Sequence, residues 1–271
     1  MSLAAYYDDH PISFDRVLAA AEARGTTGRL TADDLFEFDQ DHYGGLAAVD
    51  ALAQRARIGP GSRVLDLCAG LAGPARFLAT RTGCRVVGVE LHAGRAAGAA
   101  RLTRTVHLDG MVKVIRADAR SLPFRDGSFD ACISQEALLH IEDKAAVLDA
   151  CRRALASSGR LAFTDWIALR RLGDLERRQL TEWMAAVTLQ TIDGYRDLLG
   201  RAGFGAVEAE DISEEWRAVV RSRLQTFREL RQRYVPRVGE RQYGDWERLY
   251  EFFLRLIDDG KLGGGRFTAT R

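Results

Sequence analysis

VLDLCAGLAGPARFLA, Val64–Ala79, is a strand-like run that turns through glycines into a helical pattern. Gly70 and Gly73 punctuate the turn, and Pro74 stands at a helix start, where its missing N–H costs nothing. Any tight turn from strand to helix favours glycine, with or without a ligand. The residues around this loop must therefore show whether it holds a ligand, and which one.

Strand and helix patterns alternate between Arg63 and about Ile167, which predicts a parallel sheet covered by helices on both faces. The predicted strands are Arg63–Leu67, Arg85–Val89, Val112–Ala117, Phe129–Ser134 and Arg160–Asp165. The predicted helices between them are Pro74–Thr82, His92–His107 and Lys144–Leu155. A doubly wound sheet of this kind binds ligands at the carboxyl ends of its strands. We therefore expect an α/β fold with its site at that edge.

Two further regions flank this core and are predicted to fold over its ligand edge. Before it come the helical spacing of Ile12–Arg24 and the aromatic run LFEFDQDHYGG, 35–45. After it we predict a helix at Ile192–Ala202, a strand at Ala206–Glu210, two long arginine-rich helices within Glu214–Asp259 and an edge strand at Arg266–Thr270. We expect residues 1–45 to form an N-terminal lid, and residues 46–271 a ligand-binding domain with helical caps at about 169–202 and 213–260.

The charge balance points to a small ligand. The 271 residues include 39 Lys and Arg and 38 Asp and Glu, so the formal net charge is +1. A chain without a strong overall field has little to steer it to nucleic acid or an anionic membrane, and we expect neither partner. The arginine cluster at 217–241 is interpreted as a solvated helix whose arginines form salt bridges. The sequence leaves a homodimer open.

The four cysteines indicate a reducing environment and no metal site. Cys68, Cys84, Cys132 and Cys151 do not fall at the close spacing of a zinc site or a redox dithiol. We read them as reduced and mostly buried, which suits a cytosolic protein. The start of the chain lacks a basic residue followed by a long apolar run, and no segment approaches the ~20 apolar residues of a membrane span. A cytoplasmic location is therefore expected.

The spacing of the glycine loop separates its three candidate ligands. A dinucleotide loop reads G-x-G-x-x-G, whereas Cys68 takes the place of the first glycine here. A phosphate loop needs Gly-Lys followed by Ser or Thr, which does not follow. Both absences make the two phosphate-containing ligands less favoured than the third candidate, S-adenosylmethionine (SAM), whose product is S-adenosylhomocysteine (SAH).

One carboxylate is available for each polar part of SAM. Asp66 is expected to meet the ammonium of the methionine part, directly or through water. Glu90 ends the second strand, where a carboxylate can accept both ribose hydroxyls, although this acid alone would also suit NAD. Asp118 ends the third strand and is expected to accept the adenine amino group. The predicted cofactor-binding residues are Asp66, Cys68, Ala69, Gly70, Gly73, Glu90, Leu91, Asp118, Ala119 and Gln135.

With these residues, nearly all of Val64–Asp165 resembles the class I SAM-dependent methyltransferases. The resemblance implies a mainly parallel, Rossmann-like sheet of seven strands with a helical cap. The family usually has glycine where this chain has Cys68, and the change is tolerable if the backbone there keeps a negative φ.

The run CISQEALLHIEDKAAVL, 132–148, carries the candidate catalytic residues. Glu136 and His140 are four residues apart, so a helical turn beginning there would point both into one pocket. Together they could receive an amine. Glu136 would attract the cation, and His140 would take a proton so that the nitrogen lone pair becomes free.

The segments SQEALLH, 134–140, and GRLAFTDWIA, 159–168, resemble the sarcosine/dimethylglycine and phosphoethanolamine N-methyltransferases. By this resemblance Glu136 and His140 match an acid and a histidine of the substrate site, Trp166 matches an aromatic residue, and an N-terminal tyrosine belongs to a lid. Aromatic faces stabilise sulfonium and methylated ammonium groups. The candidate aromatic residues of the substrate site are Tyr6, Tyr7, Tyr43, Trp166 and Trp183.

Departures from the phosphoethanolamine enzymes bear on the acceptor. Those enzymes place arginine and tyrosine near the positions of Val187 and Leu189, and a lysine at the position of Leu249. Without these cations a buried phosphate would lose its partners. We therefore predict a SAM-dependent methyltransferase that acts on a small molecule other than a phosphobase, at an amine nitrogen. The alternatives are oxygen or carbon methylation of a natural product, a non-catalytic SAM-binding protein and a nucleotide oxidoreductase.

Overall fold

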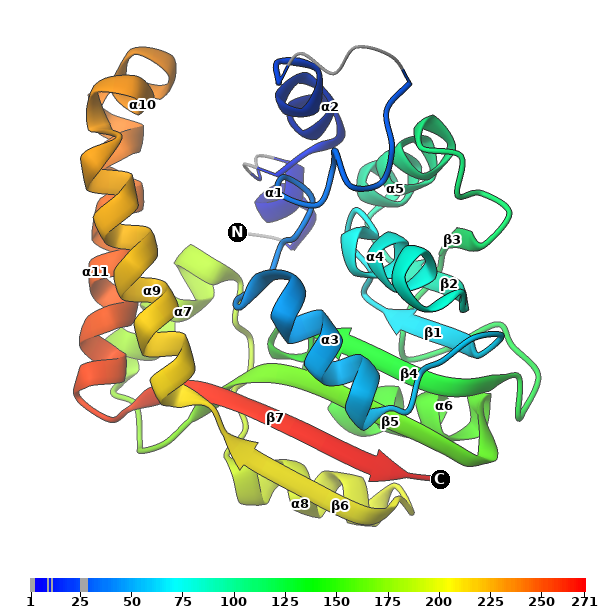
Figure 1. Ribbon diagram of the computed structural model, residues 1–271. Helices are drawn as coiled ribbons and strands as arrows, with labels where there is room; N and C mark the ends of the chain where they lie inside the picture. Colours follow the sequence, from blue (N-terminus) through cyan, green and yellow to red (C-terminus); the bar gives the residue numbers. More distant parts are fainter. Residues whose placement is uncertain (1–2, 9, 11, 25–28) are drawn as a thin grey trace.

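The structure is a computed structural model that describes residues 3–8, 10, 12–24 and 29–271. Its strands are β1 (Arg63–Leu67), β2 (Arg85–Glu90), β3 (Val112–Arg116), β4 (Phe129–Gln135), β5 (Leu155–Ala168), β6 (Gly205–Asp211) and β7 (Leu262–Thr270). In the described part of the chain they form a seven-stranded sheet in the order β3-β2-β1-β4-β5-β7-β6 (Figure 1). β1 to β5 pair in parallel, and β7 pairs antiparallel with both β5 and β6. The predicted doubly wound, mainly parallel sheet is confirmed.

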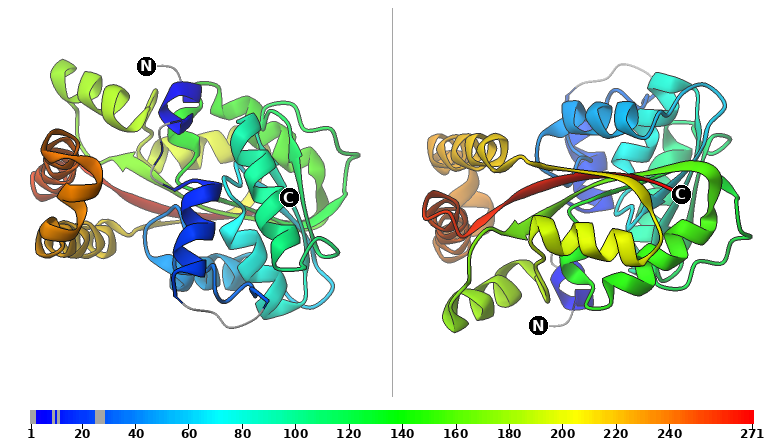
Figure 2. Two further views of the ribbon diagram at one scale, coloured as in Figure 1. Left: turned by 90° about the horizontal axis from the view of Figure 1, so that it is seen from above. Right: turned by 90° about the horizontal axis from the view of Figure 1, so that it is seen from below.

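Helices cover both faces of this sheet, as Figure 2 shows. One face carries α3 (Gly45–Arg55), α4 (Gly73–Thr82) and α5 (Ala93–Thr105), and the other carries α6 (Lys144–Ala154) and α8 (Ile192–Arg201). The three predicted helices of the core agree with α4, α5 and α6 within two residues. The fold therefore follows the periodicity of the sequence where helix and strand alternate.

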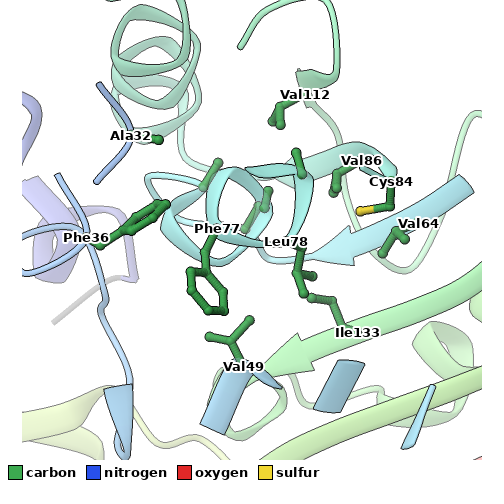
Figure 3. Packing of buried hydrophobic residues seen from close by; sticks show 14 of the residues in the cluster. Ala32, Phe36, Val49, Val64, Phe77, Leu78, Cys84, Val86, Val112 and Ile133 are labelled. Carbon is green, nitrogen blue, oxygen red and sulfur yellow. The ribbon is translucent and has the colours of Figure 1, made fainter. Parts of the chain in front are cut away.

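A buried apolar core fixes α4, and with it the glycine loop, against the sheet. Phe77 and Leu78 of α4 are 4% and 0% exposed. In Figure 3 the Phe77 ring lies between Phe36 and Val49, and Leu78 faces Ile133 of β4. The rings of Phe36 and Phe77 meet edge to face with centroids 5.3 Å apart. This packing joins the segment before α3 to the helix that follows the loop.

The last strand differs from the prediction of an edge strand at Arg266–Thr270. β7 begins at Leu262, four residues earlier, and it is an inner strand of the sheet. Its first half contains the run Gly263–Gly265, which the prediction left outside the strand. A Cβ added at Gly263 would collide with Ser213, and one added at Gly264 with Trp216. The glycines therefore let the helix Ser213–Glu229, which precedes β7 in the chain, pack directly on the strand.

The remaining helices lie at the carboxyl side of the sheet. They are α1 (Leu3–Asp8), α2 (Phe14–Glu22), α7 (Asp174–Met184), α9 (Ser213–Glu229), α10 (Arg231–Val238) and α11 (Glu240–Asp258), with a short 3₁₀ turn η1 (Leu138–His140). In Figure 1, α9, α10 and α11 stand together on the side to which the arrowhead of β1 points. Two long arginine-rich helices were expected there, and the short α10 between them is an addition.

Salt bridges join the long helices of this cap. Arg217 of α9 pairs with Glu214 and with Asp258 of α11, at 2.6 and 3.1 Å. Arg228 of α9 pairs with Glu247 of α11 at 2.7 Å. These arginines are paired with acids, as the interpretation of the cluster requires. None of the helices formed by the described residues is both long enough and apolar enough to cross a membrane.

Candidate functional site

A cavity of about 340 Å³ opens at the carboxyl edge of the parallel strands. Residues that follow β1, β2, β3 and β4 line it, together with residues of the N-terminal segment. Among the described residues, every predicted cofactor-binding residue except Gly73 lines this cavity, and so do Glu136, His140 and Tyr7. The structure therefore brings the candidate cofactor and catalytic residues to one place.

The glycine loop is held in left-handed backbone conformations. The φ angles of Cys68, Gly70 and Ala72 are 59°, 56° and 58°. The condition under which cysteine would be tolerated at this position, a negative φ at Cys68, is therefore not met. Such an angle costs a residue with a side chain of the order of 1–2 kcal/mol. The loop is fixed by hydrogen bonds to β2: the Ala69 N–H donates to the Val89 carbonyl at 2.9 Å. Strain of this kind accumulates where a ligand must be met by the backbone.

Two buried acceptor atoms in the cavity have no hydrogen-bond partner. They are Oδ2 of Asp66 and Oε1 of Gln135. Burial, with Glu90 nearby, raises the pKa of Asp66 to about 7. A buried polar atom without a partner is costly, and an ammonium would satisfy both atoms. These two acceptor atoms therefore fit the methionine ammonium of SAM, which is a hydrogen-bond donor.

Glu90 and Asp118 are the residues predicted to bind the ribose and the adenine. Glu90 accepts hydrogen bonds from the N–H groups of Gly70 and His92, at 2.9 and 2.7 Å, which fix the orientation of its carboxylate. Asp118 pairs with Arg120 at 2.6 Å, and hydrogen bonds from Arg120 lower its pKa. Both carboxylates line the cavity. Their contacts with a nucleoside stay a prediction.

Residues 39–43, called here the strap, cross the glycine loop. Asp39 forms a salt bridge with Arg76 of α4 at 2.8 Å, and both side chains are fully buried. Asp41 pairs with Arg95 of α5 at 2.7 Å. His42 Nδ1 accepts from the Gln135 amide at 3.1 Å. The strap thus ties α4, α5 and β4 together above the cofactor residues.

Gly73 serves the strap rather than the cavity. A Cβ at this position would collide with the Asp39 carbonyl. Gly73→Ala is therefore expected to lower the free energy of unfolding by about 1–3 kcal/mol, the usual cost of overpacking. Chemical denaturation measures this change. Gly59→Ala is the control, because a Cβ at Gly59 meets nothing within 4 Å, and equal stability of the two variants would contradict the close approach of the strap.

His140 is held as a neutral base. The Ala185 carbonyl lies 3.1 Å from its Nδ1, so Nδ1 carries the proton and donates. Nε2 then accepts a hydrogen bond from the Tyr7 hydroxyl, at a distance of 3.0 Å. Burial lowers the pKa of His140 to about 4, and raises that of Tyr7 well above its usual value. At neutral pH the imidazole is therefore uncharged, and the lone pair of Nε2 accepts the hydrogen bond from Tyr7.

Glu136 lines the same cavity as His140 and has a strained backbone conformation. Its φ is 52°, so it precedes η1 in the left-handed region instead of starting a regular helical turn. Its Oε1 accepts from the N–H of Tyr43 at 2.7 Å. Burial raises the pKa of Glu136 to about 8, although the hydrogen bond from the Tyr43 N–H and the positive charge of Arg223 act to lower this pKa. The carboxyl thus needs more positive charge than its surroundings supply.

The five candidate aromatic residues divide into two groups. Tyr7 lines the cavity, and the Tyr6 ring lies with its centroid 6.1 Å from that of His140. Tyr43 packs on Trp166 with centroids 5.3 Å apart, and Trp166 is 2% exposed in a core of the cap. Trp183 packs on Phe252 of α11. In the described residues only the first group reaches the cavity wall or His140. A role in substrate binding stays a prediction for all five.

The sequence and structure of this chain match known methyltransferases. Residues 65–163 match a family model described as "Methyltransferase domain". The chain is 30% identical over 222 residues to "Methyltransferase GfsG" of Streptomyces halstedii, covering 78% of each protein. The chain belongs to the class I SAM-dependent methyltransferases.

The names of other relatives of this methyltransferase specify different atoms, nitrogen or oxygen, as the site of methylation. It is 32% identical over 166 residues to a "Glycine/sarcosine/dimethylglycine N-methyltransferase" of Actinopolyspora halophila, covering 61% of this chain and 29% of that protein. It is 29% identical over 199 residues to a "27-O-demethylrifamycin SV methyltransferase" of Amycolatopsis mediterranei, covering 72% of each. The resemblance to sarcosine/dimethylglycine N-methyltransferases is thus confirmed at low identity.

The fold agrees with a solved structure. A phosphoethanolamine N-methyltransferase 2 of Haemonchus contortus, in complex with phosphomonomethylethanolamine and SAH, superimposes with a TM-score of 0.84. The identity is 19%, and the match covers all of this chain and 60% of the other. At this identity the likeness concerns the fold of the methyltransferase.

Several residues of the site are absent from the sequence predictions. Asp41 and His42 stand in the run quoted for its aromatic residues, and Arg95 lies within a helical pattern that gives no sign of a ligand. All three line the cavity. The four consecutive polar residues DQDH, 39–42, are the sign in the sequence that the strap could contribute polar groups to the site.

Proposed function

We propose that this methyltransferase acts on the nitrogen of a small amine. The observation that carries the proposal is the state of Glu136, a half-buried carboxyl that forms no ion pair within the described residues and whose pKa is raised to about 8. A cationic acceptor would supply the missing positive charge. In doing so it would return the carboxyl to its ionised form.

The charges along the cavity also favour a cation over an anion. Its two lining arginines are already paired, Arg95 with Asp41 and Arg120 with Asp118. Val187, half exposed, stands at the cavity wall near His140. An anionic acceptor would therefore have to break an existing ion pair to find a partner.

The residues of the chain suit this reaction. SAM, when bound, supplies a methyl group activated by its sulfonium. Glu136 would hold the ammonium of the acceptor, and His140 Nε2 would release its hydrogen bond from the Tyr7 hydroxyl to take one of the ammonium protons, leaving a nitrogen with a free lone pair. Tyr7 would orient His140 through its hydroxyl, and Ala185 through its carbonyl. Alignment of the nucleophile contributes most of the rate in such a displacement.

Oxygen methylation is the second candidate. The neutral imidazole of His140 could equally take a proton from a hydroxyl group. A relative named for O-methylation is as similar in sequence as the relatives named for N-methylation. The two candidates differ in their need for Glu136, because a hydroxyl acceptor carries no charge.

Glu136→Gln separates the two candidates. A charge-assisted hydrogen bond contributes about 1.5–3 kcal/mol, so we expect this variant to raise KM for an amine roughly 10- to 150-fold. A panel of amino acids, amines, phenols and alcohols is incubated with SAM, and mass spectrometry detects the gain of one methylene. KM is then measured for each acceptor found.

The control is Glu208→Gln, an exposed acid on β6, which should match the parent. Methylation of hydroxyl acceptors alone, with Glu136→Gln as active as the parent, would contradict the amine proposal and favour the second candidate. SAM binding without methylation of any acceptor class would leave the protein as a binding module.

A further inference from the structure

We propose that Arg95 is a positioning residue that couples the glycine loop to α1, and so sets Tyr7 against His140. Its guanidinium is 6% exposed and lines the cavity. Three segments that are far apart in the sequence meet on this one group.

The first contact is with the glycine loop. A Cβ built at Gly70 would lie 2.7 Å from Nη2 of Arg95, so the guanidinium lies directly against the loop backbone. Gly70 has a φ of 56° and donates its N–H to Glu90 at 2.9 Å. A ligand that moves or stiffens this loop therefore acts on the surface that Arg95 covers.

The second contact is with the strap. Nη2 of Arg95 donates to Oδ2 of Asp41 at 2.7 Å. His10 lies 3.6 Å from the same carboxylate oxygen. The side chain of Arg95 is 6% exposed and that of Asp41 is 28% exposed, so the pair is screened less than an ion pair on the surface and helps to orient the guanidinium.

The third contact is with the helix that carries Tyr7. The centre of the guanidinium lies 4.6 Å from the centroid of the Tyr7 ring, in cation–π geometry. Nη1 also donates to the Ile12 carbonyl at 3.4 Å. The hydroxyl of the same Tyr7 donates to His140 Nε2 at 3.0 Å. Arg95 thus packs on the face of the Tyr7 ring, and the hydroxyl of the same ring orients His140.

These contacts form a continuous path from the loop through Arg95 to Tyr7 and His140. Rigid packing along the path means that a bound cofactor stabilises the loop, and the loop stabilises α1. The inference depends on the cofactor site alone and holds whichever acceptor the enzyme uses.

Helix α5 offers a matched control. Arg101 lies over the ring of Phe14 at 3.7 Å, so it also joins α5 to the N-terminal segment by a cation–π contact. Its partner belongs to α2, and Arg101 is exposed. Arg101→Met therefore removes a similar contact from the same helix without touching the loop, the strap or Tyr7.

Hydrogen exchange with SAH as the probe tests the coupling. The exchange of the amides of Leu3–Asp8 is measured by mass spectrometry in the parent, Arg95→Met and Arg101→Met, with and without saturating SAH. In the parent and Arg101→Met we expect SAH to slow this exchange roughly 5- to 150-fold, the usual range of coupling between two sites. In Arg95→Met the effect of SAH should disappear, although SAH is bound.

Each other outcome overturns the proposal. These outcomes are full protection by SAH in Arg95→Met, loss of protection in Arg101→Met, and no protection in the parent. If Arg95→Met cannot bind SAH, Tyr7→Leu replaces it, with Tyr7→Phe as the control that keeps the ring. The coupling should then survive in Tyr7→Phe and vanish in Tyr7→Leu, and its persistence in Tyr7→Leu would reject the role of the cation–π contact.

Discussion

His140→Ala is expected to lower kcat/KM for the acceptor about 10²- to 10⁴-fold, the usual contribution of a general base. The imidazole accepts the Tyr7 hydroxyl at Nε2 and donates from Nδ1 to the Ala185 carbonyl. Alanine removes Nε2, the atom to which the proposal assigns the acceptor's proton. Activity should remain measurable, because alignment of the acceptor does not depend on the base. The measurement uses the acceptor found in the mass-spectrometric panel.

His140→Gln is the matched variant for this experiment. Its amide can still bridge Tyr7 and the Ala185 carbonyl, but it cannot accept a proton at neutral pH. Both variants should lose activity to a similar degree while SAH binds as tightly as in the parent. Recovery of activity in His140→Gln would show that the histidine only orients Tyr7, and the role of a base would then be rejected.

The pKa of His140 also makes the stability of the protein depend on pH. Burial lowers it from 6.5 to about 4 in the folded state. The folded state therefore binds this proton less readily than the unfolded state, and stability is lost as the pH falls from about 6.5 to about 4. His140→Gln should lose less stability than the parent over this interval. Denaturation at pH 7, 5.5 and 4.5 measures the difference, and parallel curves would contradict the neutral, buried state of His140.

The core of the fold could be predicted because its determinants are local. Alternating strand and helix patterns place β1 to β4 and α4 to α6 within a few residues of their ends. The acids Asp66, Glu90 and Asp118 stand at strand ends in the sequence. Because parallel strands end at one edge, their approach to one cavity follows from the topology.

The strap could not be predicted because its partners are remote. The partner of Asp39 is Arg76, 37 residues away, and the His42 carbonyl accepts from Arg223, 181 residues away. No periodicity links such positions. The backbone of Cys68 was unpredictable for a related reason, since the hydrogen bonds that hold the loop in its left-handed form come from another strand. In both places tertiary contacts decide what the local sequence leaves open.

Asp66→Asn is expected to weaken SAM binding roughly 10- to 150-fold, the loss of a charge-assisted hydrogen bond of about 1.5–3 kcal/mol. Oδ2 of Asp66 is buried in the cavity and has no partner in the protein, so the methionine ammonium is the group that would satisfy it. Asparagine keeps the shape of the side chain but carries no charge. Calorimetric titration with SAM measures the affinity, with Asp149→Asn on the exposed side of α6 as the control.

The pH dependence of stability and of SAM affinity, compared between Asp66→Asn and the parent, is a second test of Asp66 as a cofactor-binding residue. Burial raises the pKa of Asp66 from 3.8 to about 7. Its negative charge therefore costs stability increasingly as the pH rises from about 3.8 to about 7, and fully above that. Without SAM, Asp66→Asn should be more stable than the parent at pH 8 and equal to it near pH 3.5. With SAM the order should reverse, because only the carboxylate pairs with the ammonium. SAM affinity of the parent should rise between pH 6 and pH 8, and that of Asp66→Asn should not. A variant that binds SAM like the parent at every pH would remove Asp66 from the cofactor site.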